Sequence, residues 1–283
     1  MRYYNANVFV DGEFVRGGFR VEKGRFIEVF SGENPGSGTD LQGAYVIPGL
    51  VDIRVRGCDG ADFADGDYDG LVRMARCLAK RGTTSFAPTI APLPFEPVEL
   101  AMSTAVMLRR DRPEGCAWLA GAHMEGPFLS PDGKPDFHAF RSLFEFMYGV
   151  IGMVDVDPEL SGAGEFIAQA AELCAVHTAS AGKEVLCGSD CTAEAFRQCP
   201  EKICLVSDGR RDGGTDLYDG LCHAVSRGVP KEAAILAVTR NPARLMGVDY
   251  EVGSIAPCKR ADFIVCDEAL ERKQVFLAGK PIA

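Results

Sequence analysis

The sequence has no apolar run long enough to span a membrane, and its first residues lack the apolar core of a secretory signal peptide. It also lacks an excess of positive charge, since 40 acidic residues against 30 lysines and arginines give a net charge of −10. These absences argue against a membrane protein, a nucleic-acid partner and an anionic membrane surface. We therefore expect a cytoplasmic protein, in which a local cluster of arginines or backbone N–H groups is still able to bind a small anion.

The chain contains 11 cysteines but no Cys-x-x-Cys pair. Cys187 and Cys191 are four positions apart, Cys199 and Cys204 are five apart, and the usual zinc spacings are absent. In a reducing cytoplasm, scattered cysteines within apolar runs are favoured as small buried hydrophobic residues, and a thiolate metal site is the less favoured alternative.

Both ends of the chain are rich in short strand patterns. An Asp11-Gly12 turn between two apolar runs predicts a hairpin, and 261–267 and 274–282 have the same character near the other end. The simplest arrangement is a small β-sandwich domain made from residues 1–47 and 248–283.

The middle of the chain, 48–247, alternates strand and helix patterns, which predicts a parallel sheet covered by helices. One helix is expected over 69–81, another over 162–176, and a strand over 183–187. About six strands can be recognised where a complete (β/α)8 barrel needs eight. The predicted fold class is therefore α/β, with a shortened or incomplete TIM-like barrel and a small β-sandwich formed by both termini.

Polar residues follow the predicted strands at the points where these end. In parallel strands such residues meet at one rim, where α/β enzymes place their chemistry. They are Asp52, Arg54, Arg56, Thr89, His123, Glu125, Asp155, Asp157, Ser189, Asp190 and Asp208.

Several motifs resemble the N-acetylglucosamine-6-phosphate deacetylase family of the amidohydrolase superfamily, and they recur in order over most of the chain. The motifs are Val46-Ile47-Pro48-Gly49-Leu50-Val51-Asp52, Gly82-Thr83-Thr84-Ser85-Phe86-Ala87-Pro88-Thr89, His123-Met124-Glu125-Gly126-Pro127-Phe128, Val206-Ser207-Asp208 and Asn241-Pro242-Ala243-Arg244. The resemblance implies a distorted TIM barrel and hydrolytic removal of acetyl from an N-acetylated amino-sugar phosphate. It also implies one divalent metal, zinc or iron, with Glu125 as a metal ligand and Asp208 as the catalytic aspartate.

This sequence departs from the family pattern at its metal site. The family's first strand usually ends in His-x-His, and here it reads Arg54-Val55-Arg56. Ser189 stands where the family has a metal histidine after its fifth strand, and the family's sixth and seventh strands are expected to be missing. His138 lies in a loop that lacks the family's Gly-Ala-His.

Two alternatives follow for Arg54 and Arg56. Either they pair with Glu125 and Asp208 and fill the place of a cation, or they bind a phosphate or carboxylate of a ligand. His123, Ser189 and Asp190 are further candidates for substrate contacts or ion pairs.

Two hypotheses remain for the function, and a third concerns the assembly of the chain. The chain is a divergent deacetylase, or it is a degenerate homologue that binds a ligand or partner without hydrolysis and without a metal. In either case a homodimer is expected, because lost strands would leave apolar sheet edges to be covered.

Overall fold

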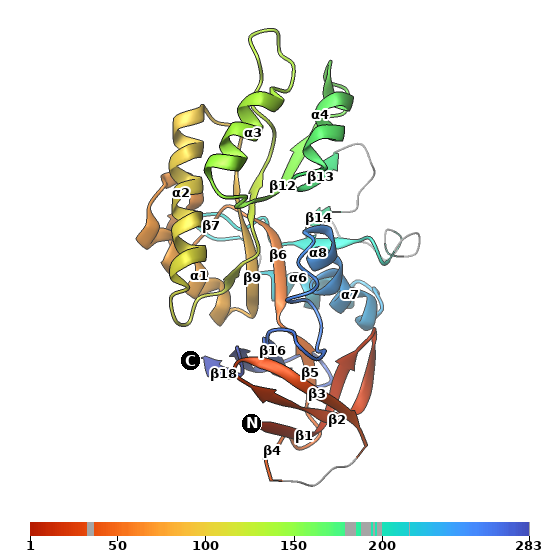
Figure 1. The fold of residues 1–283 in the computed structure, drawn as a ribbon. Coiled ribbons are helices and arrows are strands. Elements are labelled where there is room, and N and C mark those ends of the chain that lie inside the picture. The colour runs from red at the N-terminus through yellow and green to blue at the C-terminus, as the bar shows by residue number, and fades with distance from the viewer. Residues whose placement is uncertain are drawn as a thin grey trace.

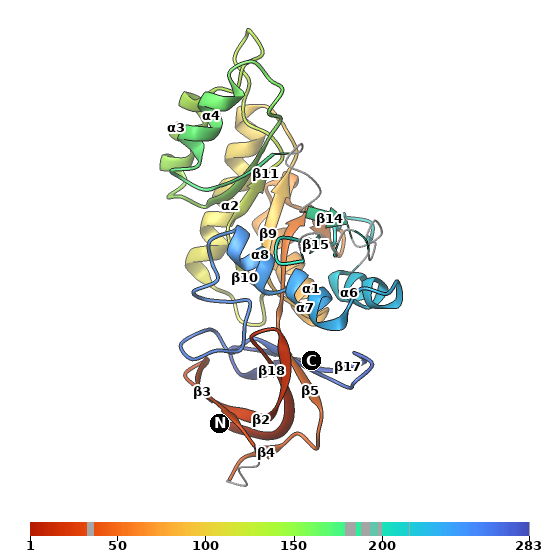
Figure 2. The same cartoon turned by 90° about the vertical axis from the view of Figure 1, so that its right-hand side faces the viewer.

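The computed structural model describes residues 1–32, 37–178, 185–187, 194, 196, 200–214 and 216–282. It shows two main β-sheets, one made by the two ends of the chain and the other by its middle (Figure 1). The view turned by 90° shows the sheet of the termini below the helices and strands of the middle (Figure 2). The fold is α/β, as the sequence predicted, with a curled parallel sheet and a separate sheet from the termini.

The terminal sheet contains eight strands, and the two ends of the chain meet where β5 pairs antiparallel with β16. Asp11 and Gly12, with φ of 51° and 98°, form the turn of the predicted hairpin between β1 and β2. The strands are β1 (Arg2–Val10), β2 (Glu13–Glu22), β3 (Arg25–Ser31), β4 (Thr39–Asp40), β5 (Tyr45–Pro48), β16 (Phe263–Cys266), β17 (Arg272–Leu277) and β18 (Lys280–Ile282).

Aromatic side chains from both ends of the chain hold the terminal sheet together. The rings of Phe263 and Phe276 stack with centroids 4.3 Å apart, and Tyr3 meets Phe263 edge-on at 5.3 Å. Neither end would bury these rings alone. The domain division into 1–47 with 248–283 and 48–247 stays a prediction.

The middle of the chain forms parallel strands that curl into part of a barrel. Strand β9 lies between β6 and the two short strands β10 and β11, and β12 and β13 continue on the far side of β11. Strands β14 and β15 pair with each other, and a bridge from Val55 to Gly209 places β15 beside β6. The strands are β6 (Leu50–Val55), β9 (Thr83–Ile90), β10 (Trp118–Leu119), β11 (Ala122–Met124), β12 (Ile151–Val156), β13 (Ala175–Thr178), β14 (Val185–Cys187) and β15 (Cys204–Val206).

Helices cover the outside of the parallel strands. In α1, Asp67 caps the first turn by accepting hydrogen bonds from two backbone N–H groups, and Leu71, Met74 and Leu78 are buried on one face. The helices are α1 (Tyr68–Lys80), α2 (Phe95–Asp111), α3 (Phe137–Phe146), α4 (Ala163–Ala170), α6 (Leu217–Ser226), α7 (Lys231–Ala237) and α8 (Arg240–Leu245), with short elements β7 (Gly57–Cys58), β8 (Ala61–Asp62) and η1 (Phe63–Asp65) between β6 and α1.

The helix predicted over 162–176 is wrong in its second half. Helix α4 ends at Ala170, and β13 pairs in parallel with β12 from Ala175 onward. The fifth strand position therefore belongs to β13 and not to the 183–187 segment, whose described part, β14, pairs with β15. The sequence 179–184 separates β13 from β14.

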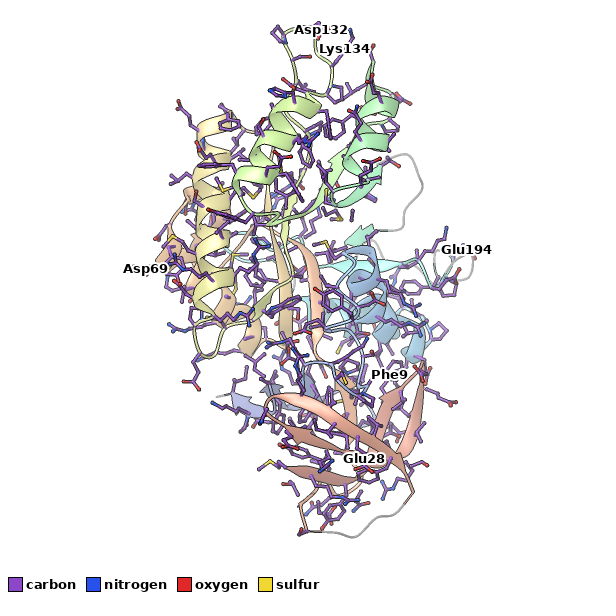
Figure 3. All side chains as sticks on the ribbon, viewed as in Figure 1. Phe9, Glu28, Asp69, Asp132, Lys134 and Glu194 are labelled. Carbon is purple, nitrogen blue, oxygen red and sulfur yellow. A yellow bond between two sulfur atoms is a disulfide. The ribbon has the colours of Figure 1, made fainter. Side chains whose placement is uncertain are left out.

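Two further features complete the fold. Between β11 and α3 the chain extends beyond the strand ends, and Asp132 pairs with Lys134 at its tip at 2.7 Å (Figure 3). The structure pairs Cys58 with Cys77 as a disulfide, which the expectation of scattered buried thiols did not include. In the described parts of the chain, no helix has the length and apolar character that crossing a membrane requires.

Candidate functional site

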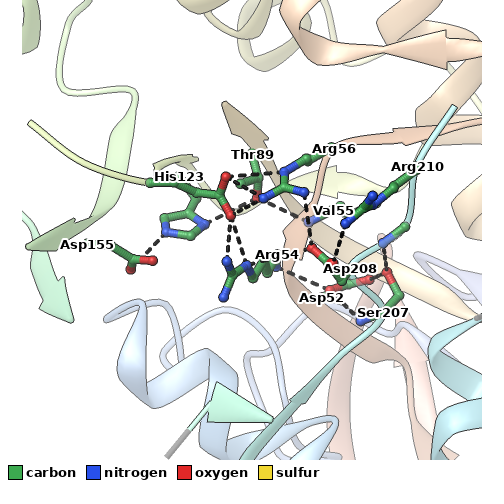
Figure 4. Close-up of polar contacts among 12 residues, drawn as sticks. Asp52, Arg54, Val55, Arg56, Thr89, His123, Asp155, Ser207, Asp208 and Arg210 are labelled. Carbon is green, nitrogen blue, oxygen red and sulfur yellow. Dashed lines mark hydrogen bonds and ion pairs between the residues drawn. The ribbon is translucent and has the colours of Figure 1, made fainter. Parts of the chain in front are cut away.

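Four charged residues meet at the carboxyl ends of the parallel strands, and we call this group the rim cluster: Arg54, Arg56, Glu125 and Asp208 (Figure 4). Arg54 lies in β6 and Arg56 directly follows it, whereas Glu125 follows β11 and Asp208 follows β15. Neighbouring parallel strands end at the same edge, so residues distant in sequence become neighbours in space.

Both arginines donate to the carboxylate of Glu125. Arg54 Nη2 lies 2.6 Å from Glu125 Oε1, and Arg56 Nη2 lies 2.6 Å from both carboxylate oxygens. The Nε atoms add hydrogen bonds of 3.0 Å from Arg54 and 3.2 Å from Arg56. Only 8% of the Glu125 side chain is exposed, so these short charge-assisted bonds compensate a nearly buried charge.

The electrostatics of Glu125 follow from this geometry. Burial alone would raise the pKa of the Glu125 carboxyl, but the hydrogen bonds from Arg56 and Arg54 outweigh it and hold this pKa below its usual range. The hydrogen bond to Glu125 in turn raises the pKa of Arg56. Glu125 is therefore a carboxylate at neutral pH, with both oxygens already bonded to cations.

Asp208 is less tightly held than Glu125. Its Oδ1 lies 3.7 Å from Arg54 Nε and 3.8 Å from Arg56 Nη1, which is ion-pair range but beyond a direct hydrogen bond. Its backbone has a φ of 47°, a left-handed conformation that is uncommon for an aspartate, and its N–H donates to the carbonyl of Arg54 at 3.1 Å. The surrounding strands thus hold Asp208 in an unfavourable backbone state with its side chain 24% exposed.

A second carboxyl lies directly beneath the rim cluster. Asp52 is fully buried and accepts a 2.5 Å hydrogen bond from Ser207 Oγ, and Ser207 Oγ accepts one from the N–H of Gly209 at 3.0 Å. Burial raises the pKa of Asp52 to about 7 in spite of these hydrogen bonds. This pair links β6 to β15 just before Asp208.

Two histidines share one carboxylate beside the rim cluster. His123 Nε2 lies 3.0 Å and His177 Nδ1 lies 3.1 Å from Asp155 Oδ1, and Thr89 Oγ1 lies 3.2 Å from His123 Nδ1. Burial would raise the pKa of Asp155, but the two imidazoles outweigh this and lower it. Asp155 therefore remains a carboxylate bridging β11 and β13.

The comparisons with known proteins agree on one family. Residues 170–282 match the signature described as Amidohydrolase family. A curated N-acetylglucosamine-6-phosphate deacetylase of Caenorhabditis elegans is 23% identical over 351 positions, which cover 86% of this chain and 84% of that protein. The crystal structure of such a deacetylase from Mycobacterium smegmatis superimposes with a TM-score of 0.86 at 20% identity, with full coverage of both chains.

This chain is thus similar to N-acetylglucosamine-6-phosphate deacetylases, and its C-terminal part matches the Amidohydrolase family. The 351 aligned positions exceed the 283 residues of the whole chain, so the alignment contains internal gaps. The chain spans less than half the length of some curated relatives: 27% of the Vibrio furnissii deacetylase at 31% identity, and 45% of the Bos taurus enzyme at 27% identity. At these levels the structural likeness shows the fold alone.

The residues of the rim cluster do not fit the family's metal. A catalytic zinc takes about three protein ligands. Within the described parts of the chain, no group of three or more His, Cys, Asp and Glu side chains is arranged so that it could hold a metal ion. Glu125, which the resemblance gives as a metal ligand, has both oxygens bonded to guanidinium groups, and a divalent cation beside Arg54 and Arg56 would be repelled.

The predicted site residues separate into three groups. Arg54, Arg56, Glu125 and Asp208 come together. His123 does not join them, because its ring points to Asp155 and Thr89 and is buried. Ser189 and Asp190 lie outside the described residues.

Sequence reasoning missed two neighbours of the site. His177 directly follows the predicted helix 162–176 and was not among the predicted site residues, whereas it lies in β13 and contacts Asp155. Ser207 was passed over although it adjoins Asp208. Its signal was its place beside Asp208 in the Val206-Ser207-Asp208 motif.

Proposed function

We propose that this chain acts on an N-acetylated amino-sugar phosphate, as an amidohydrolase that removes the acetyl group. The observation that carries the proposal is the survival of the family's carboxylates in one place. Glu125 and Asp208 come from different strands, yet Arg54 lies 2.6 Å from the first and 3.7 Å from the second. The similarity to N-acetylglucosamine-6-phosphate deacetylases suggests the substrate class.

Asp208 and the two arginines of the rim cluster can each be given a role in hydrolysis, with no step through a metal. Asp208 is within ion-pair range of Arg54 and Arg56 but makes no direct hydrogen bond to either, so its carboxylate retains capacity to accept a proton from water. The water oxygen then bonds to the acetyl carbon, the carbon–nitrogen bond breaks, and the proton passes to the leaving amine. The two guanidinium groups supply positive charge toward the acetyl oxygen.

A second candidate function is binding of the same anionic ligand without hydrolysis. The specific observation is that Glu125 is 8% exposed and is fully bonded by two arginines, which gives a stable, charge-compensated centre in place of a metal. In this alternative Asp208 and the arginines recognise the ligand but no bond is broken.

Acetate release from N-acetylglucosamine-6-phosphate by the purified protein separates the two functions. Hydrolysis that Asp208→Asn abolishes supports the amidohydrolase, and elemental analysis of the same sample reports any bound zinc or iron. Calorimetric binding of the sugar phosphate without acetate release supports the ligand-binding alternative. Neither binding nor release would reject both.

We further propose that the protein is a cytoplasmic homodimer. Among the described strands, β13 pairs only with β12 and β14 pairs only with β15, and open sheet edges favour a covering partner. Size-exclusion chromatography with light scattering tests this, and a monomer at micromolar concentration would contradict it.

A further inference from the structure

A second basic region lies away from the rim cluster, around a cavity of about 490 Å³ that we call the basal cavity. Its walls bring together Arg76, Lys80, Arg109, Arg112, Arg260 and Lys280. The cavity adjoins Trp118 at the start of β10, whereas Glu125 follows β11, and seven residues of extended chain span roughly 20 Å. The cavity and the rim cluster therefore lie at opposite ends of one strand position.

The cations of the basal cavity come from separate elements. Lys80 and Arg109 lie in the last turns of α1 and α2, where the helix dipole favours a positive charge in any case. Arg260 and Lys280 come from the C-terminal part of the chain, where no such reason applies. Their convergence in a chain with a net charge of −10 concentrates positive potential at this place.

Part of this charge has no carboxylate partner. Glu114 pairs with Lys280 at 3.0 Å, and Asp262 pairs with Arg260 at 2.9 Å. For Arg76, Lys80 and Arg112, the described residues provide no ion pair with a carboxylate. A pocket with more cations than anions attracts a small anion.

The floor of the basal cavity is apolar. Leu108, Leu119 and Leu277 are buried there, and the ring of Trp118 forms part of the wall. The guanidinium of Arg260 lies 6.0 Å from the centre of that ring. A hydrophobic floor with charged groups at its edge is the usual composition of a site for a small organic ligand, and the volume lies within the usual range.

We propose that the basal cavity binds a small organic anion. In this ligand, one phosphate or carboxylate group is attached to a single aromatic or aliphatic group. The anionic group contacts Arg76, Lys80 and Arg112, and the apolar group packs against Trp118 and the leucine floor. This site is separate from the rim cluster, so its occupancy does not depend on the function proposed for that cluster.

Titration calorimetry with phenyl phosphate tests the proposal, and Trp118, the only tryptophan in the chain, reports binding by its fluorescence. We expect saturable binding of phenyl phosphate, with weaker binding of inorganic phosphate and of benzyl alcohol, because each supplies only half of the required chemistry. The double variant Lys80→Glu/Arg112→Glu is expected to weaken binding about tenfold or more. Arg227→Glu, a single charge reversal at an exposed residue directly after α6, is the control for each of the two reversals and should bind normally.

Four outcomes would overturn the proposal. They are no saturable binding, equal binding of benzyl alcohol, equal weakening in the Arg227→Glu control, and loss of binding in Arg54→Met, which would place the ligand at the rim cluster. A dimer that Lys80→Glu/Arg112→Glu dissociates would also count against it, because the cavity would then be covered by a second copy. Circular dichroism confirms that each variant is folded.

Discussion

The rim cluster and the basal cavity both concentrate arginine in an acidic protein, but they differ in what the guanidinium groups contact. At the rim, Arg54 and Arg56 are bonded to Glu125 at 2.6 Å, and Glu125 is almost completely buried. At the basal cavity, Arg76 and Arg112 are exposed and have no carboxylate partner among the described residues.

Because of this difference, we expect the rim arginines to contribute to stability and the arginines of the basal cavity to contribute to ligand binding. Removing one member of a buried, hydrogen-bonded ion pair leaves a charge without compensation, which destabilises the fold. Exposed cations without a partner contribute little to stability and remain available to a ligand. Variants at the rim should therefore change the free energy of unfolding, and variants at the basal cavity should change affinity.

The largest effect is expected for Glu125→Gln. The change removes the charge that two partly buried guanidinium groups share, and we expect the free energy of unfolding to fall by about 3–5 kcal/mol. Urea denaturation measures it. Arg54→Met/Arg56→Met/Glu125→Leu, which removes the whole charged group, should recover most of the loss. A small effect of Glu125→Gln would show that the rim is no more tightly paired than an exposed ion pair.

The rim cluster also shows which features of the site the sequence could predict and which it could not. The strand-end positions of Arg54, Glu125 and Asp208 could be derived because each follows an apolar run, and parallel strands end at one edge. The choice between pairing and ligand binding depends on side-chain distances, which no sequence pattern encodes.

Two other parts of the fold could not be predicted from the sequence, because they depend on tertiary contacts. The run from Phe166 to Val176 is rich in alanine and also contains glutamine, glutamate and leucine, so local propensity favours a helix throughout. Pairing with β12 overrides this from Ala175 onward. The basal cavity joins α1, α2, β10 and β18, and their contact is a product of tertiary packing alone.

The next effect is on the pH dependence of stability. It concerns Asp52, the buried carboxyl under the rim cluster, and has no counterpart among the described residues that line the basal cavity. Its pKa is raised from 3.8 to about 7, so the folded protein keeps a proton that the unfolded chain has lost. The free energy of unfolding should therefore fall as pH rises from about 4 to about 7, by about 2–4 kcal/mol from this group. Asp52→Asn should remove this part of the pH dependence in denaturation series, and an unchanged slope would contradict it.

A smaller effect is expected for Asp155→Asn, which replaces the carboxylate between His123 and His177. Loss of the hydrogen bond to His177 at 3.1 Å and of the ion-pair contact with His123 at 3.0 Å should lower the free energy of unfolding by about 2 kcal/mol. Asp157→Asn is the control, since Asp157 is exposed on the same segment and should change stability by less than about 0.5 kcal/mol. Equal effects of the two variants would show that the histidine pair does not stabilise the sheet.

The smallest effect on stability is expected at the basal cavity. Arg76→Ala and Arg112→Ala remove exposed cations that have no carboxylate partner among the described residues, so each should change the free energy of unfolding by less than about 0.5 kcal/mol. Arg56→Met at the rim removes the same type of charge and should cost several times more, because it leaves Glu125 with one arginine. The same denaturation assay measures all three variants. If the cavity variants were as destabilising as Arg56→Met, their guanidinium groups would already be part of the packed structure, and the contrast between paired and available arginines would be lost.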